Sequence, residues 1–328
     1  MSKEKIYFRK MKYLVPLPLL LSLLFTCLTF GRVHRQPSTP VNSAIPSLSR
    51  AQQTPPSDNS QIILNVTVTN SKGNYLWAID KSRFAVNDGK DLKEITSFRY
   101  EDTPASVGVI LDTSASMGSV LTKVKGAMAH FIELSNRSNE YFVISFSDHP
   151  QLQADWTHDP NEAISKIGSI RPTGQTSLYD ACIVGLEKLS TATCQKHVLL
   201  LITDGLDNRS RHNFKELRRL LEEKTDILLY AVGVGIHEEY EIAGEQVLFE
   251  LARISGGRAV SPRNITDFNA AFERIAVELR HQYMIGFKPA NDGKWHGIKI
   301  KLVAPGSAPE VFHDAALRSR KGYWASTK

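Results

Sequence analysis

Four short, continuously apolar segments between residues 105 and 282 constrain the fold most strongly. They are VGVIL (107–111), YFVISF (141–146), HVLLLI (197–202) and ILLYAVGV (227–234). None of them alternates polar and apolar side chains, as a strand with one solvent face would. Strands without this alternation are typical of parallel sheets that helices cover on both faces. The segments therefore predict the central strands of such a sheet.

Helical periodicity fills the intervals between these segments. The predicted helices span residues 119–136, 161–169, 177–190, 211–224, 246–255 and 267–282. Strands that alternate with helices at this spacing indicate an α/β fold with a doubly wound, mostly parallel sheet and right-handed crossovers. Ligands of such sheets bind beyond the carboxyl ends of the strands, so a functional site is expected there.

Oxygen-bearing side chains follow two of the predicted strands. Asp112, Ser114 and Ser116 come directly after the first strand, in DTSAS, and Asp204 follows the third, in LITDG. Thr176, in GQTSLYDA, precedes a predicted helix. Taken singly, such residues are usually helix caps or turn residues. Together, on three loops at one sheet edge, they favour a site for a hard divalent cation: Mg²⁺, with Mn²⁺ or Ca²⁺ as alternatives.

With these motifs in this order, residues 105–282 resemble the von Willebrand factor type A domain, and the three loops resemble its metal-ion-dependent adhesion site. The resemblance implies that Ser114 and Ser116 bind the metal directly. It implies that Asp112, Thr176 and Asp204 bind it directly or through water. The segments SGGRAVSP (255–262) and FERIAVELRHQYMIGF (272–287) resemble the bacterial envelope branch of this family.

The chemistry of these ligands favours binding over catalysis. Two carboxylates offset the charge of Mg²⁺, three neutral hydroxyls leave it electrophilic, and an open coordination position can accept an Asp or Glu carboxylate from a protein partner. We therefore expect a non-enzymatic, Mg²⁺-dependent adhesion module with no catalytic residue. A metal-independent scaffold or accessory subunit of an envelope assembly is the alternative. A metal-dependent hydrolase is less favoured, because Ser114 stands where a DxDxT phosphotransferase needs an acidic side chain.

The N-terminal residues predict export. Residues 1–31 place a basic stretch before an uncharged, mostly apolar run, Tyr13–Phe30, as in a signal peptide or membrane anchor. As a helix this run would extend about 27 Å, against a hydrocarbon core of about 30 Å, which leaves cleavage and anchoring both open. Residues 32–60, rich in Pro and Ser, predict a linker. The remainder is expected to be extracytoplasmic, either secreted or anchored to the cell membrane by the N-terminal segment.

Charge excludes nucleic acid as a partner. The formal net charge is +6, from 40 basic and 34 acidic residues. Residues 1–60 hold 8 of the basic and 2 of the acidic residues, so the rest of the chain has 32 of each. The folded part is neutral and lacks the basic footprint of a DNA-binding or RNA-binding protein.

The two flanking arms, residues 61–104 and 283–328, carry β-strand signals. Alternation over 62–69 predicts a half-buried strand, and Asn-Asp-Gly sequences at 87–89 and 291–293 predict turns. Arms of 44 and 46 residues are near the size at which isolated domains lose stability. We therefore predict one β-sandwich-like module, with residues 105–282 inserted into it; separate packing of each arm is the alternative. If the arms join, a shift of the 267–282 helix on ligand binding would reach the module, a hypothesis that rests on the resemblance.

Overall fold

The computed structural model describes residues 61–100, 102–235, 241–303 and 314–327. The expected signal or anchor and the Pro/Ser-rich linker lie outside these residues. In the described ranges, no helix has the length and apolar character needed to cross a bilayer. All described residues belong to one unit, Pro55–Lys328.

A six-stranded sheet with the order β10-β9-β8-β5-β6-β7 forms the centre of the α/β domain. Its strands are β5 (Ala105–Asp112), β6 (Glu140–Phe146), β7 (Pro150–Thr157), β8 (Lys196–Thr203), β9 (Ile227–Gly233) and β10 (Ala259–Val260). Every pairing is parallel except that of β6 with β7. The predicted mostly parallel sheet is confirmed, and the four apolar segments are β5, β6, β8 and β9.

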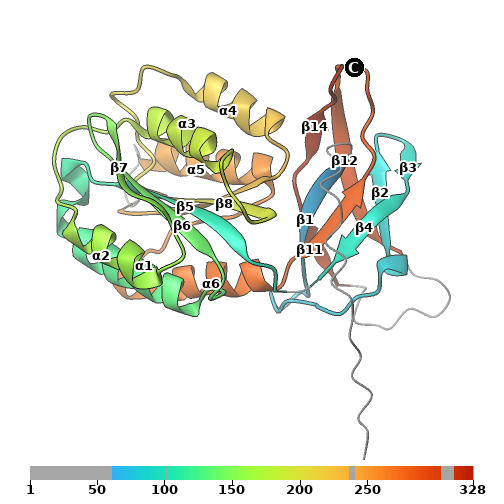
Figure 1. Cartoon of the computed structure of the whole chain (residues 1–328), viewed down its shortest axis with the longest axis horizontal. Helices are drawn as coiled ribbons and strands as arrows, with labels where there is room; N and C mark the ends of the chain where they lie inside the picture. The colour runs from blue at the N-terminus through green and yellow to red at the C-terminus, as the bar shows by residue number, and fades with distance from the viewer. Residues whose placement is uncertain (1–60, 101, 236–240, 304–313, 328) are drawn as a thin grey trace, which may run out of the picture. The chain divides into compact units, whose positions relative to one another are not determined.

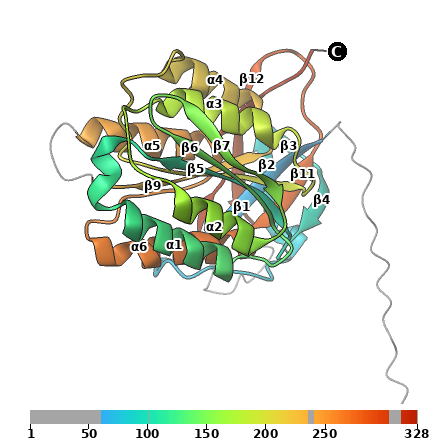
Figure 2. The same cartoon turned by 60° about the vertical axis from the view of Figure 1, so that its left-hand side comes forward.

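Helices cover both faces of this sheet (Figures 1 and 2). They are α1 (Leu121–Leu134), α2 (Pro160–Ser169), α3 (Leu178–Leu189), α4 (Phe214–Glu223), α5 (Glu241–Ser255) and α6 (Phe268–Arg280). Helices α1, α2 and α6 pack on the face that contains Val109, and α3, α4 and α5 on the face that contains Ile110. Since adjacent strand residues point to opposite faces, both faces of β5 require apolar side chains.

Local sequence accounts for several helix boundaries. Pro160 begins α2 directly after Asp159, whose side chain accepts a hydrogen bond from Asn161 N. Asn213 and Glu216 form a reciprocal capping box at the start of α4, which places the first helical residue, Phe214, three residues after the predicted 211. A short 3-10 helix, Ala115–Ser119, precedes α1.

The two arms together form a second pair of sheets, which we call the β module. One sheet has the order β13-β1-β11-β4 and the other β14-β12-β2-β3, all antiparallel. The strands are β1 (Ile62–Thr69), β2 (Phe84–Asp88), β3 (Asp91–Lys93), β4 (Ile95–Arg99), β11 (Tyr283–Phe287), β12 (Trp295–Leu302), β13 (Ala316–Arg318) and β14 (Gly322–Trp324). Each sheet mixes strands from both arms, and one apolar core joins them. The predicted joining of the arms is confirmed.

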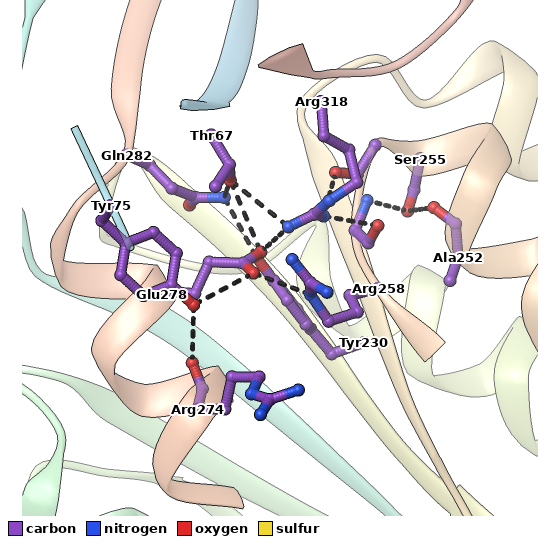
Figure 3. Close-up of polar contacts among 12 residues, drawn as sticks. Thr67, Tyr75, Tyr230, Ala252, Ser255, Arg258, Arg274, Glu278, Gln282 and Arg318 are labelled. Carbon is purple, nitrogen blue, oxygen red and sulfur yellow. Dashed lines mark hydrogen bonds and ion pairs between the residues drawn. The ribbon is translucent and has the colours of Figure 1, made fainter. Parts of the chain in front are cut away.

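Strand β1 differs from the prediction of a half-buried strand. The alternate apolar residues from Ile62 to Val68 are buried in the core of the β module, but Asn65 and Thr67 on the opposite side are buried as well. Thr67 Oγ1 lies 3.4 Å from Glu278 Oε1 of α6 and 3.3 Å from Gln282 Nε2 (Figure 3). The second face of β1 is therefore covered by polar side chains at the end of α6 and just beyond it rather than by water.

Candidate functional site

The five predicted site residues lie at the carboxyl end of the central sheet. Asp112 ends β5, and Asp204 directly follows β8. These two strands pair in parallel, with Leu111 opposite Ile202. Thr176 lies on the loop that leads into α3. Parallel pairing brings the carboxyl ends of β5 and β8 to the same edge of the sheet. Polar residues that are distant in the chain therefore meet there.

Four of the five residues belong to one hydrogen-bonded cluster. Ser114 and Ser116 place their Oγ atoms 3.0 Å apart, and Ser116 Oγ donates to Asp204 Oδ2 at 2.8 Å. Ser114 N donates to Asp112 Oδ1 at 2.8 Å. Ser116 is exposed, whereas Asp112 and Ser114 are buried. The cluster thus runs from a buried carboxylate to an oxygen at the surface.

Thr176 is connected to this cluster through the backbone. Ala115 N donates to Gly174 O at 3.1 Å, and Thr173 N donates to Thr113 O at 2.7 Å, which joins the loop of the two serines to the loop of Thr176. Thr176 N in turn donates to Asn208 Oδ1 at 2.9 Å, on the loop that follows Asp204. Thr176 is therefore held between the other two loops of the site.

Asp112 is the most buried carboxylate of the cluster. Burial raises its pKa to about 6, and the negative charge of Asp204 adds to the increase, while hydrogen bonds from Thr203 and Ser114 oppose it. Thr203 Oγ1 donates to Asp112 Oδ2 at 2.6 Å. Thr203 was not among the predicted site residues, because its only signal in the sequence is a hydroxyl directly before Asp204. Its contact fixes the second oxygen of Asp112.

Two other carboxylates near this edge support the loop between β8 and α4. Asp207 Oδ2 accepts hydrogen bonds from Tyr179 N at 3.1 Å and from Ser210 Oγ at 2.6 Å. Asp180 accepts from the backbone nitrogens of Arg211 and His212. These bonds tie the loop to the start of α3, so both residues have structural roles here.

A comparison with protein families identifies the domain that carries these loops. Residues 107–206, which include all five site residues, match the model of the von Willebrand factor type A domain. The chain contains a von Willebrand factor type A domain. No curated protein matches its sequence.

Solved structures with A domains resemble the chain weakly. BatB from Bacteroides thetaiotaomicron is 18% identical, with a TM-score of 0.44, over 53% of this chain and 98% of BatB. The von Willebrand factor domain of the type V pili tip protein Mfa5 from Porphyromonas gingivalis is 12% identical, with a TM-score of 0.46, over 53% of this chain and 94% of that one. A von Willebrand factor type A protein from Catenulispora acidiphila is 13% identical, with a TM-score of 0.48, over 82% of this chain and 75% of that one. At these values the likeness concerns the fold and carries nothing about partners.

The oxygen–oxygen separations of the cluster are those of hydrogen bonds, and they also match the spacing of adjacent Mg²⁺ ligands. Adjacent ligands of an octahedral Mg²⁺, each about 2.05 Å from the ion, are about 2.9 Å apart. The two side-chain oxygen separations in the cluster are 3.0 Å for Ser114 to Ser116 and 2.8 Å for Ser116 to Asp204. Within the described ranges, no group of three or more His, Cys, Asp or Glu could hold a metal. A cation at this edge would thus depend on the hydroxyls as well as the carboxylates.

Proposed function

We propose that this protein is a non-enzymatic, extracytoplasmic binding module of the cell envelope. Its A domain would hold Mg²⁺, or Mn²⁺ or Ca²⁺, through Asp112, Ser114, Ser116, Thr176 and Asp204. A protein partner would add an Asp or Glu carboxylate to the ion. The observation that carries this proposal is the cluster of Ser114, Ser116 and Asp204 oxygens, spaced at 2.8 and 3.0 Å beside the buried Asp112.

The charges within the cluster support a cation at this position. Asp112 is fully buried, and the charge of Asp204 contributes to the rise of its pKa. A divalent cation between the two carboxylates would offset their repulsion and the cost of burying Asp112. It would also supply the positive charge that attracts a partner's carboxylate.

The surface around the cluster supports an acidic partner. Arg171, Arg209 and Arg211 are exposed and lie on loops that carry the site. Arg209 N donates to Thr176 O at 3.1 Å, which places its backbone beside a proposed ligand. Among the residues that the structure describes, none of these guanidinium groups forms an ion pair. Unpaired arginines at a binding surface favour carboxylate-bearing partners.

Binding is favoured over hydrolysis by the position of Asp112. Its carboxyl is fully buried, and Ser114 N and Thr203 Oγ1 donate to its two oxygens. A general acid or base must reach the reacting group within hydrogen-bond distance. Because Asp112 is enclosed by its own loop and β8, it does not reach a substrate in this way, which supports binding rather than hydrolysis.

Cation binding is the first test. Calorimetry with MgCl₂ should show binding by the purified protein and none by Asp112→Ala or Ser116→Ala. The matched controls are Asp91→Ala and Ser119→Ala, at exposed positions, which should bind like the unaltered chain. Circular dichroism checks that each variant is folded. Equal Mg²⁺ binding by Ser116→Ala and Ser119→Ala would contradict the proposed ligand set.

Partner capture separates adhesion from the scaffold alternative. Envelope proteins retained by the immobilised protein in Mg²⁺ should be released by chelator and should not bind Asp112→Ala. A scaffold that docks without metal would retain the same proteins under all three conditions. That result would refute the metal-dependent role and leave the fold assignment intact.

A further inference from the structure

A pocket that contains none of the candidate metal ligands borders both the A domain and the β module. It has a volume of about 400 Å³ and lies between helices α4 and α5 and strands β12 and β14. Helix α4 packs beside β14 (Figure 1). Trp295 and Trp324 line it from the β module, and Arg218, Glu222 and Arg253 line it from the helices.

The two tryptophans form an exposed aromatic platform. They are opposite each other in the pairing of β12 with β14, with ring centroids 5.7 Å apart and an interplanar angle of 64°. Trp295 is 40% exposed and Trp324 is 44% exposed. A Cβ atom on Gly322 would lie 2.5 Å from Trp295 Cζ2. The ring of Trp295 therefore rests against the backbone of Gly322, which fixes its position.

A buried arginine connects the strand and the helix that border the pocket. Arg320, which precedes β14, is 2% exposed. Its guanidinium donates to Leu221 O and Glu222 O at 3.2 Å each and to Lys224 O at 3.1 Å. These carbonyls lie at the end of α4, where the helix leaves them without helical partners. Arg320 thus fixes β14 against α4, and the platform is set before any ligand binds.

The polar wall of the pocket is nearly neutral. Arg218 Nε pairs with Glu222 at 2.9 Å, and Arg253 Nε pairs with Glu250 at 2.7 Å. Lys321 also lines the pocket, is exposed, and forms no ion pair in the described part of the chain. The wall therefore offers fixed hydrogen-bonding groups and one unmatched positive charge.

The two tryptophans and the polar wall together limit the kinds of ligand that this pocket can bind. Exposed indole faces bind an aromatic ring, an organic cation or the C–H face of a sugar ring. The unmatched positive charge of Lys321 disfavours an organic cation. A wholly apolar ring would cover the ion pairs of Arg218 and Arg253 and exclude water from their remaining N–H groups, which is costly. A sugar ring has an apolar face together with hydroxyls at its edge, and Lys321 adds attraction for a carboxylate. We propose that this pocket binds a saccharide unit that carries a carboxylate.

The test uses two oligosaccharides of equal length that differ in charge. The full chain is titrated with the tetramer of galacturonic acid and with a glucose tetramer, and binding is followed by calorimetry. Chelator is present, so the candidate metal site does not contribute. The acidic tetramer should bind at least tenfold more tightly than the neutral one. Absence of binding by the acidic tetramer at 10 mM would overturn the proposal, as would stronger binding of adenosine monophosphate, which would indicate a nucleotide site.

Variants assign the binding to this pocket. Trp324→Ala should weaken binding of the acidic tetramer at least tenfold, with Trp324→Phe intermediate, and Lys321→Gln should remove the preference for the acidic tetramer. The matched control is Trp77→Ala, because Trp77 is 69% exposed and packs on His281, outside the pocket. Thermal unfolding checks that each variant is folded. Equal losses in Trp77→Ala and Trp324→Ala would refute the assignment, as would an unchanged preference in Lys321→Gln.

Discussion

Glu278 joins the A domain to the β module through a buried ionic network (Figure 3). Its side chain is fully buried and pairs with Arg318 of β13 and with Arg258, whose Nε lies 2.9 Å away. Tyr230 Oη donates to the same carboxylate at 2.6 Å. Burial alone would raise the pKa of Glu278, but the two arginines outweigh it and hold this pKa below its ordinary value.

Replacing Glu278 by Gln keeps the volume of the side chain and removes its charge. Arg318 and Arg258 then lose their shared counterion. Breaking a buried ion pair in this way costs about 3–5 kcal/mol. Because the two arginine side chains are 27% and 32% exposed, water offsets part of the loss. We therefore expect a decrease of about 3 kcal/mol in the free energy of unfolding, and a melting temperature lower by about 6–12 °C.

Urea unfolding, followed by circular dichroism and tryptophan fluorescence, measures this change. The control is Glu273→Gln, at an exposed position of the same helix, which should change the free energy of unfolding by less than about 0.5 kcal/mol. The lowered pKa of Glu278 means that its contribution is present above its ordinary pKa of 4.5 and is lost as the pH falls through the folded-state value. A difference below 1 kcal/mol between the two variants at pH 7 would refute the reasoning.

Three further predictions concern buried or paired groups. Hydrogen bonds from His296 to Asp292 and Asp88 raise the pKa of His296. The contribution of His296 to stability is therefore complete below pH 6.5 and is lost as the pH rises through the folded-state pKa. In urea unfolding, His296→Ala should destabilise the protein more at pH 5.5 than at pH 9. Burial lowers the pKa of Lys196 from 10.5 to about 8, so between these values the unfolded chain binds more protons than the folded protein. The free energy of unfolding of the unaltered protein should therefore rise between pH 8 and pH 10, relative to that of Lys196→Met. Parallel pH profiles of the two proteins would contradict this. Burial raises the pKa of the Cys182 thiol, so iodoacetamide should modify Cys182 only after unfolding, as mass spectrometry would show.

Side-chain patterns in the sequence predict most of the central sheet. β5, β6, β8 and β9 are buried on both faces, and burial on both faces leaves a continuous apolar segment in the sequence. β7 is different, because it is an antiparallel edge strand with exposed residues such as Leu152, and its sequence PQLQADWT lacks that signal. β10 has two residues, too few for any periodicity.

The positions of the candidate metal ligands could also be predicted from the sequence, because parallel strands bring their carboxyl ends to one edge. The sequence did not predict which buried groups contact each other. Thr203 bonds Asp112 across 91 positions, and Thr67 meets Glu278 across 211. In the sequence Glu278 is an ordinary helix glutamate. Local patterns record which faces of an element avoid water, whereas the partner of a buried charge depends on how distant segments pack, and only the tertiary structure decides that.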